Sequence, residues 1–197
     1  TLYADMQPNV LAFDELLGSP MIDALRPSID RDNVLTMAVS FSSSLLDSPN
    51  IVVTGASYDI EMINAIEWLL DEGRIAQGDT LGHIYLEGDY GENALAGAEY
   101  AAAELGVEIA AQKVQPTDAD LTAAVTAVDD AGVDVVLLTT TPPQAASAVA
   151  VAQASGLDMS FVGSNPSFSP ALLRSPAAEA LQSSYEMVSS VAPYVSD

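Results

Sequence analysis

LGHIYLEGDYGENALAGAEYAAAELG, residues 81–106, is the stretch that decides the fold of this chain. Residues 81–87 form a short and nearly continuous apolar run, which is typical of a strand buried on both faces of a parallel sheet. The alanine-rich segment that follows repeats its apolar residues every three or four positions, and Gly106 stands where a helix would end. The stretch therefore predicts a strand followed by a helix that returns the chain to a neighbouring parallel strand.

The same unit recurs along the chain. Further strands are expected at 107–114, 133–139, 161–163 and 183–191, and helices from about Ala119 to Gly132 and from Pro142 to about Gly156. The strands begin about every 26 residues, which is the spacing of βα units in a parallel sheet. Residues 54–190 are therefore expected to form an α/β lobe with helices on both faces of its sheet.

The first 53 residues contain fewer elements of the same kind. Strands are expected at 10–13, 34–39 and 51–53, and a helix is expected to about Arg31, with Ser19 as its N-cap and Pro20 at its first position. Three short strands with one or two helices leave apolar faces uncovered. We therefore expect residues 1–53 to be part of a lobe, and the isolated chain to be oligomeric or poorly stable, for instance as a homodimer.

The composition excludes several classes of function. Five basic residues, scattered singly, stand against 28 acidic ones, for a net charge of −23. Binding to nucleic acid requires clustered Lys and Arg, so a nucleic-acid partner is rejected. The chain has no cysteine, which excludes disulfides, thiolate catalysis and thiolate metal sites. No apolar run reaches the ~18 residues that a membrane-spanning helix needs.

Residues for catalysis are also missing. His83 is the only histidine and lies in a predicted strand, so we interpret it as a core or edge residue rather than a catalytic one. A transition-metal site is not expected with one histidine and no cysteine. Gly88 and Gly91 form neither a dinucleotide fingerprint nor a phosphate loop, and no nucleophile elbow is present. No catalytic residue, metal or cofactor is predicted.

Several local patterns resemble a known family in their order. They are the turn at 87–91 (EGDYG) after a strand, the turn at 139–142 (TTTP), the short strand 161–163 (FVG), the turn at 18–20 (GSP) and the serine-rich segment 40–47. Taken together they resemble the type I periplasmic solute-binding proteins of the branched-chain amino acid (Leu/Ile/Val-binding) ABC transporter family. The resemblance covers nearly the whole chain.

The resemblance implies two three-layer, Rossmann-like α/β lobes with parallel sheets, which close by a hinge on a ligand in the cleft between them. It places a first crossover between the lobes near Thr54 and a second at 191–197, with the chain truncated at both ends. It also implies a periplasmic or extracellular protein, lipid-anchored through a missing N-terminal segment, with an ABC permease as its partner. The ligand would be a branched-chain amino acid or a related amide or carboxylate.

The resemblance further implies a set of ligand contacts at the carboxyl ends of the strands, where the loops converge. The positions that match the family's site are Ser19, Ser40, Ser42, Tyr90, Thr141 and Asn165. Hydroxyl groups and helix N-termini there would hold a ligand carboxylate. Asn165 stands where amino-acid binders commonly have an acidic residue. Because a neutral amide does not neutralise a buried ammonium group, Asn165 favours a carboxylate or amide ligand.

Structural roles are the alternative for five of these residues. Ser19 suits a helix cap, Ser40 and Ser42 a polar loop, and Tyr90 and Asn165 the turns in which they lie. Two other functions also remain open on the sequence alone. One is a sensory or regulatory module of the same fold, such as an amide sensor or a receptor ectodomain. The other is an enzyme on a flavodoxin-like lobe, which lacks a phosphate loop and a catalytic constellation.

Overall fold

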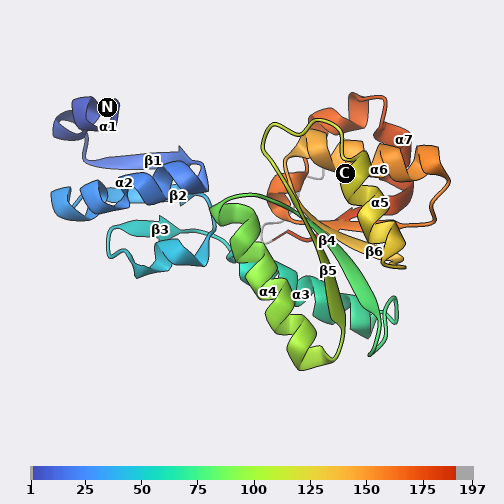
Figure 1. Cartoon of the computed structure of the whole chain (residues 1–197). Coiled ribbons are helices and arrows are strands. Elements are labelled where there is room, and N and C mark those ends of the chain that lie inside the picture. The colour runs from blue at the N-terminus through green and yellow to red at the C-terminus, as the bar shows by residue number, and fades with distance from the viewer. Residues whose placement is uncertain (1, 190–197) are drawn as a thin grey trace, which may run out of the picture.

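The computed structural model describes residues 2–189 and contains two separate parallel sheets (Figure 1). The first has three strands in the order β1-β2-β3, and the second has five in the order β5-β4-β6-β7-β8. Every strand pair in both sheets is parallel. The predicted α/β class with parallel sheets is confirmed.

The three-stranded sheet is built by the first part of the chain. Its elements are α1 (Leu2–Met6), the 3-10 helix η1 (Gln7–Asn9), β1 (Ala12–Leu17), α2 (Ser19–Asp32), β2 (Leu35–Val39), the 3-10 helix η2 (Ser43–Asp47) and β3 (Ile51–Val53). Helix α2 packs its fully buried Ile22 and Ile29 against Ala38 of β2 and Ile51 of β3. This small core lies on one face of the sheet.

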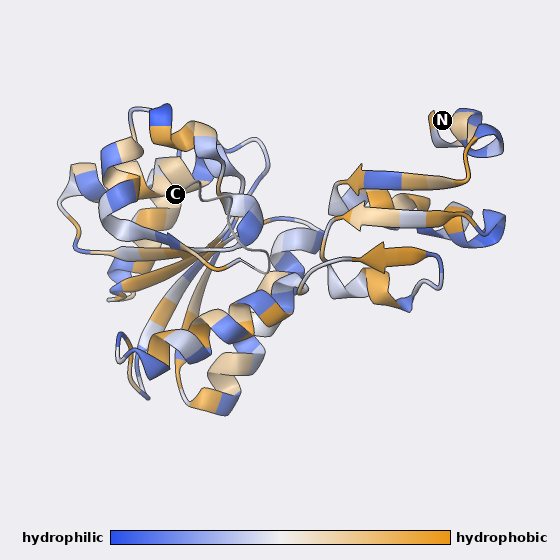
Figure 2. Ribbon diagram, turned by 180° about the vertical axis from the view of Figure 1, so that it is seen from behind, coloured by the Kyte–Doolittle hydropathy of each residue, from blue (hydrophilic) through white to orange (hydrophobic). Residues whose placement is uncertain are grey.

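Among residues 2–189, no helix covers the other face of the three-stranded sheet, and we call this the open face. Side chains along β2 alternate, so Thr36 and Ala38 are buried while Leu35, Met37 and Val39 are 51%, 41% and 40% exposed. Figure 2 shows the three strands with no helix in front of them. The uncovered apolar face that the sequence predicted is therefore present.

The five-stranded sheet is built by the rest of the described chain. Its elements are α3 (Tyr58–Asp71), β4 (Thr80–Leu86), α4 (Asp89–Leu105), β5 (Glu108–Val114), α5 (Thr122–Asp130), β6 (Val135–Thr139), α6 (Pro142–Ser155), β7 (Ser160–Gly163), the 3-10 helices η3 (Asn165–Ser167) and η4 (Pro170–Arg174), α7 (Ala178–Ser184) and β8 (Tyr185–Met187). Helices α3 and α4 cover one face, and α5, α6 and α7 cover the other (Figure 1). Within residues 2–189, none of the helices has the length and apolar character needed to cross a membrane.

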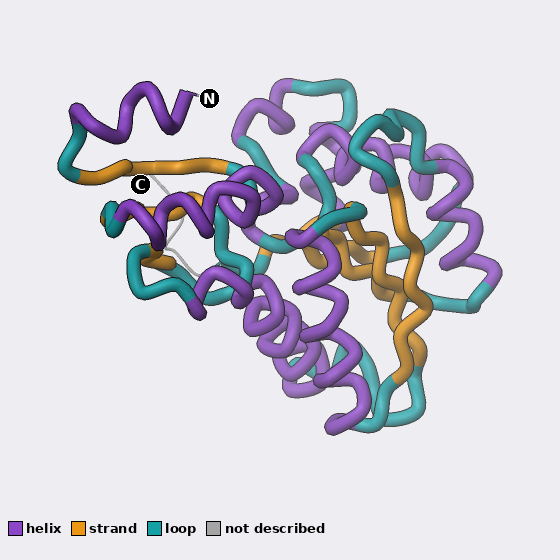
Figure 3. Tube along the Cα trace, turned by 60° about the vertical axis from the view of Figure 1, so that its left-hand side comes forward, coloured by secondary structure: helices purple, strands orange, loops and turns teal. Residues whose placement is uncertain are grey.

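Close backbone packing fixes the layer formed by α3 and α4. The two helices lie side by side (Figure 3), and a Cβ atom added at Gly97 of α4 would stand 2.2 Å from the carbonyl oxygen of Asp59 on α3. A Cβ atom at Gly91 would stand 1.9 Å from the carbonyl oxygen of Leu86. Only glycine permits these approaches, so α4 is held tightly against both α3 and the end of β4.

The single histidine lies in the centre of the five-stranded sheet. His83 on β4 is fully buried, and its Nε2 atom lies 2.9 Å from the hydroxyl of Thr139 on β6. Burial lowers the pKa of His83 to about 3, so its ring is neutral in the folded protein. The interpretation of His83 as a core histidine is confirmed.

The first strand was predicted too early. It was expected at 10–13, but β1 spans Ala12–Leu17 and continues through Asp14 and Glu15. Glu15 has a φ of 55°, and the pairing with β2 shifts register between Phe13 and Leu16. An edge strand with exposed side chains tolerates this bulge and its two carboxylates, whereas a buried strand would not.

The start of α2 also differs from the prediction by one residue. Ser19 was expected as the N-cap, but Gly18 is the N-cap and Ser19 is the first helical residue. Gly18 has a φ of 105°, and its carbonyl oxygen accepts hydrogen bonds from the N–H groups of Met21 (3.0 Å) and Ile22 (2.9 Å). The positive φ explains why glycine takes the cap position.

Two boundaries in the five-stranded sheet need similar corrections. The helix expected from about Ala119 begins at Thr122, because the Asp120 carboxylate accepts hydrogen bonds from the Thr122 N–H and hydroxyl and ends the preceding turn. The strand expected at 183–191 is shorter. Ser183 and Ser184 end α7, and the strand β8 follows from Tyr185. The second crossover expected at 191–197 lies outside the described residues.

Candidate functional site

A cavity of about 410 Å³ lies where the two sheets meet. The three-stranded sheet contributes Leu17, Gly18, Ser19, Pro20, Val39 and Phe41, and the five-stranded sheet contributes Tyr58, Leu86, Tyr90, Asn165 and Pro166. These residues lie at or just after the carboxyl ends of β1, β2, β4 and β7, apart from Tyr58, which starts α3. The carboxyl ends of parallel strands are the usual place for a ligand site in α/β folds. The lining is mostly apolar and aromatic, with a few hydroxyl and amide groups.

Ser19 lines the cavity on the three-stranded side, and Ser40 adjoins it without being a lining residue. The hydroxyls of Ser19 and Ser40 are hydrogen-bonded to each other, and both side chains are buried. Ser19 is the first residue of α2, so the positive end of that helix dipole faces the same place. Two hydroxyls beside a helix N-terminus can hold the carboxylate of a ligand.

An aromatic wall joins the two sheets. The rings of Phe41 and Tyr58 lie with centroids 6.1 Å apart, and those of Tyr58 and Tyr90 meet edge to face at 4.6 Å. The carbonyl oxygen of Phe41 also accepts a hydrogen bond of 3.0 Å from the N–H of Tyr58. The three rings offer a ligand a broad apolar surface with hydroxyl groups on two of them.

Tyr90 is fixed in its position by hydrogen bonds. Its hydroxyl lies 2.5 Å from the Ser164 hydroxyl and 3.4 Å from the carbonyl oxygen of Thr140. Burial raises the pKa of Tyr90 well above its usual value, the Ser164 hydrogen bond lowers it in part, and the neighbouring Tyr58 and Glu61 raise it further. Tyr90 therefore offers the cavity a neutral hydroxyl.

Asn165 forms the opposite polar part of the wall, directly after β7. Its side-chain oxygen accepts a hydrogen bond of 3.2 Å from the Ser189 hydroxyl. Its backbone N–H donates over 3.4 Å to the carboxylate of Glu61 on α3. Glu61 is only 1% exposed.

Sequence reasoning missed Glu61, although the sequence carries a signal for it. The buried stripe of α3 consists of Tyr58, Glu61, Met62, Ala65, Ile66 and Leu69. A carboxylate at helical spacing within such an apolar stripe is unusual, because burying a charge is costly without compensating contacts. That pattern could have pointed to Glu61 before the structure was known.

The remaining two predicted residues, Ser42 and Thr141, are like Ser40 not among the residues that line the cavity. The hydroxyl of Ser42 accepts a hydrogen bond of 3.4 Å from the Ser44 N–H at the start of η2. Thr141 begins α6, and both its N–H (3.1 Å) and its hydroxyl (2.9 Å) donate to the side-chain oxygen of Gln144. Contact of Ser42 or Thr141 with a ligand stays a prediction.

A polar junction beside the cavity holds η2 against α4. The side chain of Asn93 accepts a hydrogen bond from the Ser43 N–H (3.2 Å) and donates one to the Ser43 hydroxyl (2.7 Å). The Ser44 hydroxyl donates to Asp89 at 3.3 Å. These contacts link residues that are about 50 positions apart in the chain, so no local sequence pattern predicts them.

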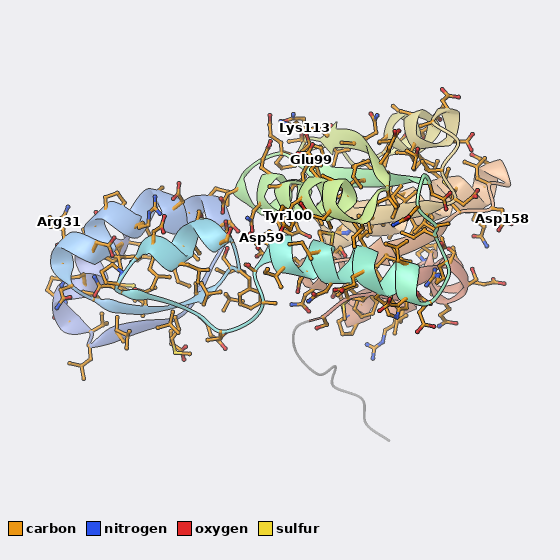
Figure 4. The ribbon with its side chains drawn as sticks, turned by 90° about the horizontal axis from the view of Figure 1, so that it is seen from below. Arg31, Asp59, Glu99, Tyr100, Lys113 and Asp158 are labelled. Atoms are coloured by element: carbon orange, nitrogen blue, oxygen red, sulfur yellow. The ribbon has the colours of Figure 1, made fainter. Side chains whose placement is uncertain are left out.

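Asp59 belongs to the same junction, and Figure 4 shows it between the two parts of the molecule. Partial burial acts to raise the pKa of its carboxyl group. Hydrogen bonds from Ser57, Ser43, the Ile60 N–H and Asn93 outweigh that effect and lower the pKa below its usual value. The Asp59 carboxylate is therefore stabilised in its charged form where the two sheets meet.

Comparison with known proteins gives consistent results. A family model described as periplasmic binding protein matches residues 4–196. A solved fatty acid ABC transporter substrate-binding protein from Thermomonospora curvata is 42% identical, with a TM-score of 0.92 over 94% of this chain and 48% of that one. No match was found among the curated proteins searched.

More distant structures share the fold. A branched-chain amino acid ABC transporter protein from Thermus thermophilus with bound valine is 23% identical, with a TM-score of 0.80 over 91% of this chain and 47% of that one. A leucine binding protein from Thermotoga maritima is 15% identical, with a TM-score of 0.79 over 91% of this chain and 51% of that one. The chain spans about half the length of the structures it matches.

Proposed function

Because the chain belongs to the periplasmic binding protein family, we propose that it forms the ligand-binding part of an extracytoplasmic solute-binding component of an ABC transporter. In this proposal residues 1–53 are part of one lobe and residues 54–190 form the other. The observation that carries the proposal is the cavity at the carboxyl ends of strands from both sheets. A binding site shared by two lobes suits a protein that captures a solute and performs no chemistry on it.

The proposed mechanism is closure of the two lobes on the ligand. Ser19 and Ser40 contact it from the three-stranded side, and Tyr90 and Asn165 contact it from the five-stranded side. A ligand that touches both sides binds the closed state more tightly than the open one, and this difference in affinity shifts the population toward closure.

The ligand that suits this cavity has an acid group and an apolar body. Its carboxylate would lie at the Ser19 and Ser40 hydroxyls and the N-terminus of α2, and its apolar part against Leu17, Val39 and Phe41. The names of two similar structures support this class. One is a fatty acid binding protein and the other holds valine, and both ligands combine a carboxylate with an apolar group. We therefore favour a carboxylate, amide or branched-chain amino acid ligand.

The remaining parts of the proposal concern location and partner. The protein would act in the periplasm or outside the cell, attached by a lipid anchor, and its closed form would dock on an ABC permease. Similar structures that are substrate-binding proteins of ABC transporters support this assignment. Stimulation of permease ATPase activity by the liganded protein would test it against a sensory role.

A thermal-shift screen of the full-length protein tests the binding function. The panel contains leucine, valine, 4-methylpentanoate and 4-methylpentanamide, which share a branched apolar body and differ in their polar groups. We expect at least one of them to raise the melting temperature, because a ligand that binds only the folded state stabilises it.

Variants test whether a ligand found in this screen binds in the cavity. Ser40→Ala should weaken binding about tenfold, which corresponds to the loss of one hydrogen bond to a charged group. Ser183→Ala, which changes an exposed serine at the end of α7, is the matched control. No shift with any compound, or equal binding by Ser40→Ala and the wild type, would contradict the proposed site.

A further inference from the structure

Glu61 is a buried acidic residue that the proposed contacts do not use. It faces inward on α3, between Tyr58 and Met62 of the same buried stripe. Its carboxylate accepts the hydrogen bond from the N–H of Asn165, whose side chain lines the cavity. Glu61 therefore places a carboxyl group directly behind one wall of the cavity.

The two polar walls consequently differ in their electrostatic character. Among the described residues that line the cavity, none carries a charged side chain. On the three-stranded side, the N-terminus of α2 at Ser19 provides a partial positive charge. On the five-stranded side, the Glu61 carboxyl group lies behind the cavity wall, where it accepts the hydrogen bond of the Asn165 N–H.

Such a difference matters because the cavity is apolar. Charges a few ångströms apart interact far more strongly in a low-dielectric site than in water. With Glu61 ionised, a carboxylate would be favoured beside Ser19 and disfavoured beside Asn165, while a neutral or positively charged group would be accepted beside Asn165. A ligand with an acid group at each end would bring one of them against Glu61.

We propose that Glu61 is ionised and is a positioning residue that sets the specificity of this cavity, so that the cavity accepts monocarboxylates and rejects dicarboxylates. Glu61 acts through the wall at Asn165 and does not touch the ligand. The inference rests on the proposed binding function and adds the rule by which ligands are selected.

Matched probes on the full-length protein test this rule by isothermal titration calorimetry. Hexanoate and adipate have the same six-carbon chain and differ in the second carboxylate. The wild type should prefer hexanoate. Glu61→Gln keeps the shape and an acceptor oxygen but removes the charge, so it should raise the affinity for adipate relative to hexanoate about tenfold or more. Glu67→Gln, an exposed position on the same helix, should leave the ratio unchanged.

The ratio of the two affinities separates specificity from a purely structural role, because a general loosening of the fold weakens both probes alike. The inference is overturned if wild type binds adipate as well as hexanoate, or if Glu61→Gln leaves the ratio unchanged. Failure of both probes, together with the panel used for the proposed function, overturns the binding function itself and the inference with it.

A second variant keeps the test decisive if Glu61→Gln does not fold. Asn165→Asp adds a negative charge on the cavity wall itself, where it should act in the same direction as an ionised Glu61. It should increase the preference for hexanoate over adipate, and it should favour leucine over 4-methylpentanoate, which lacks the ammonium group. An unchanged preference in both pairs would overturn the inference.

Discussion

The two sheets of this molecule are built from the same βα units but are covered differently. In the five-stranded sheet, β6 is buried along its whole length, and helices lie on both faces. In the three-stranded sheet, α2 covers one face and the side chains of β2 on the other face are exposed. A parallel sheet needs cover on both faces to be stable alone. The same type of βα unit therefore forms hydrophobic cores on both faces of the five-stranded sheet but on only one face of the three-stranded sheet, among the residues that the structure describes.

The largest expected effect comes from comparing the removal of a leucine side chain in each sheet, one buried and one on the open face. Leu138 in β6 is fully buried, and Leu138→Ala should lower the free energy of unfolding by about 3 kcal/mol through lost burial and a new cavity. Leu35 in β2 is 51% exposed, so Leu35→Ala should change it by about 0.5 kcal/mol. Urea unfolding followed by circular dichroism measures both. If both variants lose the same free energy of unfolding, the open face of β2 is covered in solution.

The contact between α3 and α4 gives the next effect. Gly→Ala inside a helix usually stabilises by about 1 kcal/mol. Gly97→Ala should instead destabilise by about 2 kcal/mol, because its Cβ would stand 2.2 Å from the carbonyl oxygen of Asp59. Ala96→Gly at the neighbouring exposed position is the control for helix propensity, and thermal melts compare the two. A stabilised Gly97→Ala protein would show that the helices do not approach so closely.

Acid should act on the five-stranded sheet through His83. Its pKa is about 3 in the folded state and 6.5 as a free group, so the unfolded chain takes up a proton between these values and the folded chain does not. The stability that the neutral ring provides is thus complete above pH 6.5 and is lost as the pH falls. The loss should reach about 1.4 kcal/mol at pH 5.5. His83→Gln should remove this pH dependence of the free energy of unfolding. If the wild type and the variant show the same dependence on pH, His83 is not its cause.

The smallest effect on stability is expected on the open face itself, where self-association is the better measurement. The isolated 197-residue chain should self-associate through this face, most clearly in high salt, which screens the net charge of −23. Met37→Ser, at a residue that is 41% exposed, should reduce association while changing stability by about 0.5 kcal/mol or less. Light scattering over a concentration series tests this, and a monodisperse wild-type monomer at high salt would contradict it.

The sequence predicted the five-stranded sheet better than the three-stranded one, for a physical reason. A strand buried on both faces, such as β4 or β6, is a continuous apolar run and is visible without knowledge of its neighbours. The edge strand β1 contains Asp14 and Glu15, which its exposed position tolerates, so the strand predicted from the sequence ended at Phe13. Local propensity also could not place the cap of α2 at Gly18, because the choice depends on a positive φ.

The site was predictable where it follows from strand ends and not where it depends on packing. Ser19, Tyr90 and Asn165 line the cavity, and Ser40 is bonded to Ser19, as loops at the carboxyl ends of strands would place them. Ser42 and Thr141 lie near strand ends too, but they cap helices. Glu61 and the Ser43–Asn93 pair were missed, because they are brought to the site by contacts between distant parts of the chain.

The hydrogen-bonded pair of Ser43 and Asn93 has a mechanical consequence. It lies beside the cavity, at the junction of two arms whose outer ends carry Arg31 and Asp158 in Figure 4. A rotation about a point near the cavity would move those outer ends much farther than it would move Ser19 or Asn165. If the two arms close on a solute as proposed, a small movement at the cavity would therefore become a large displacement at the distant surfaces.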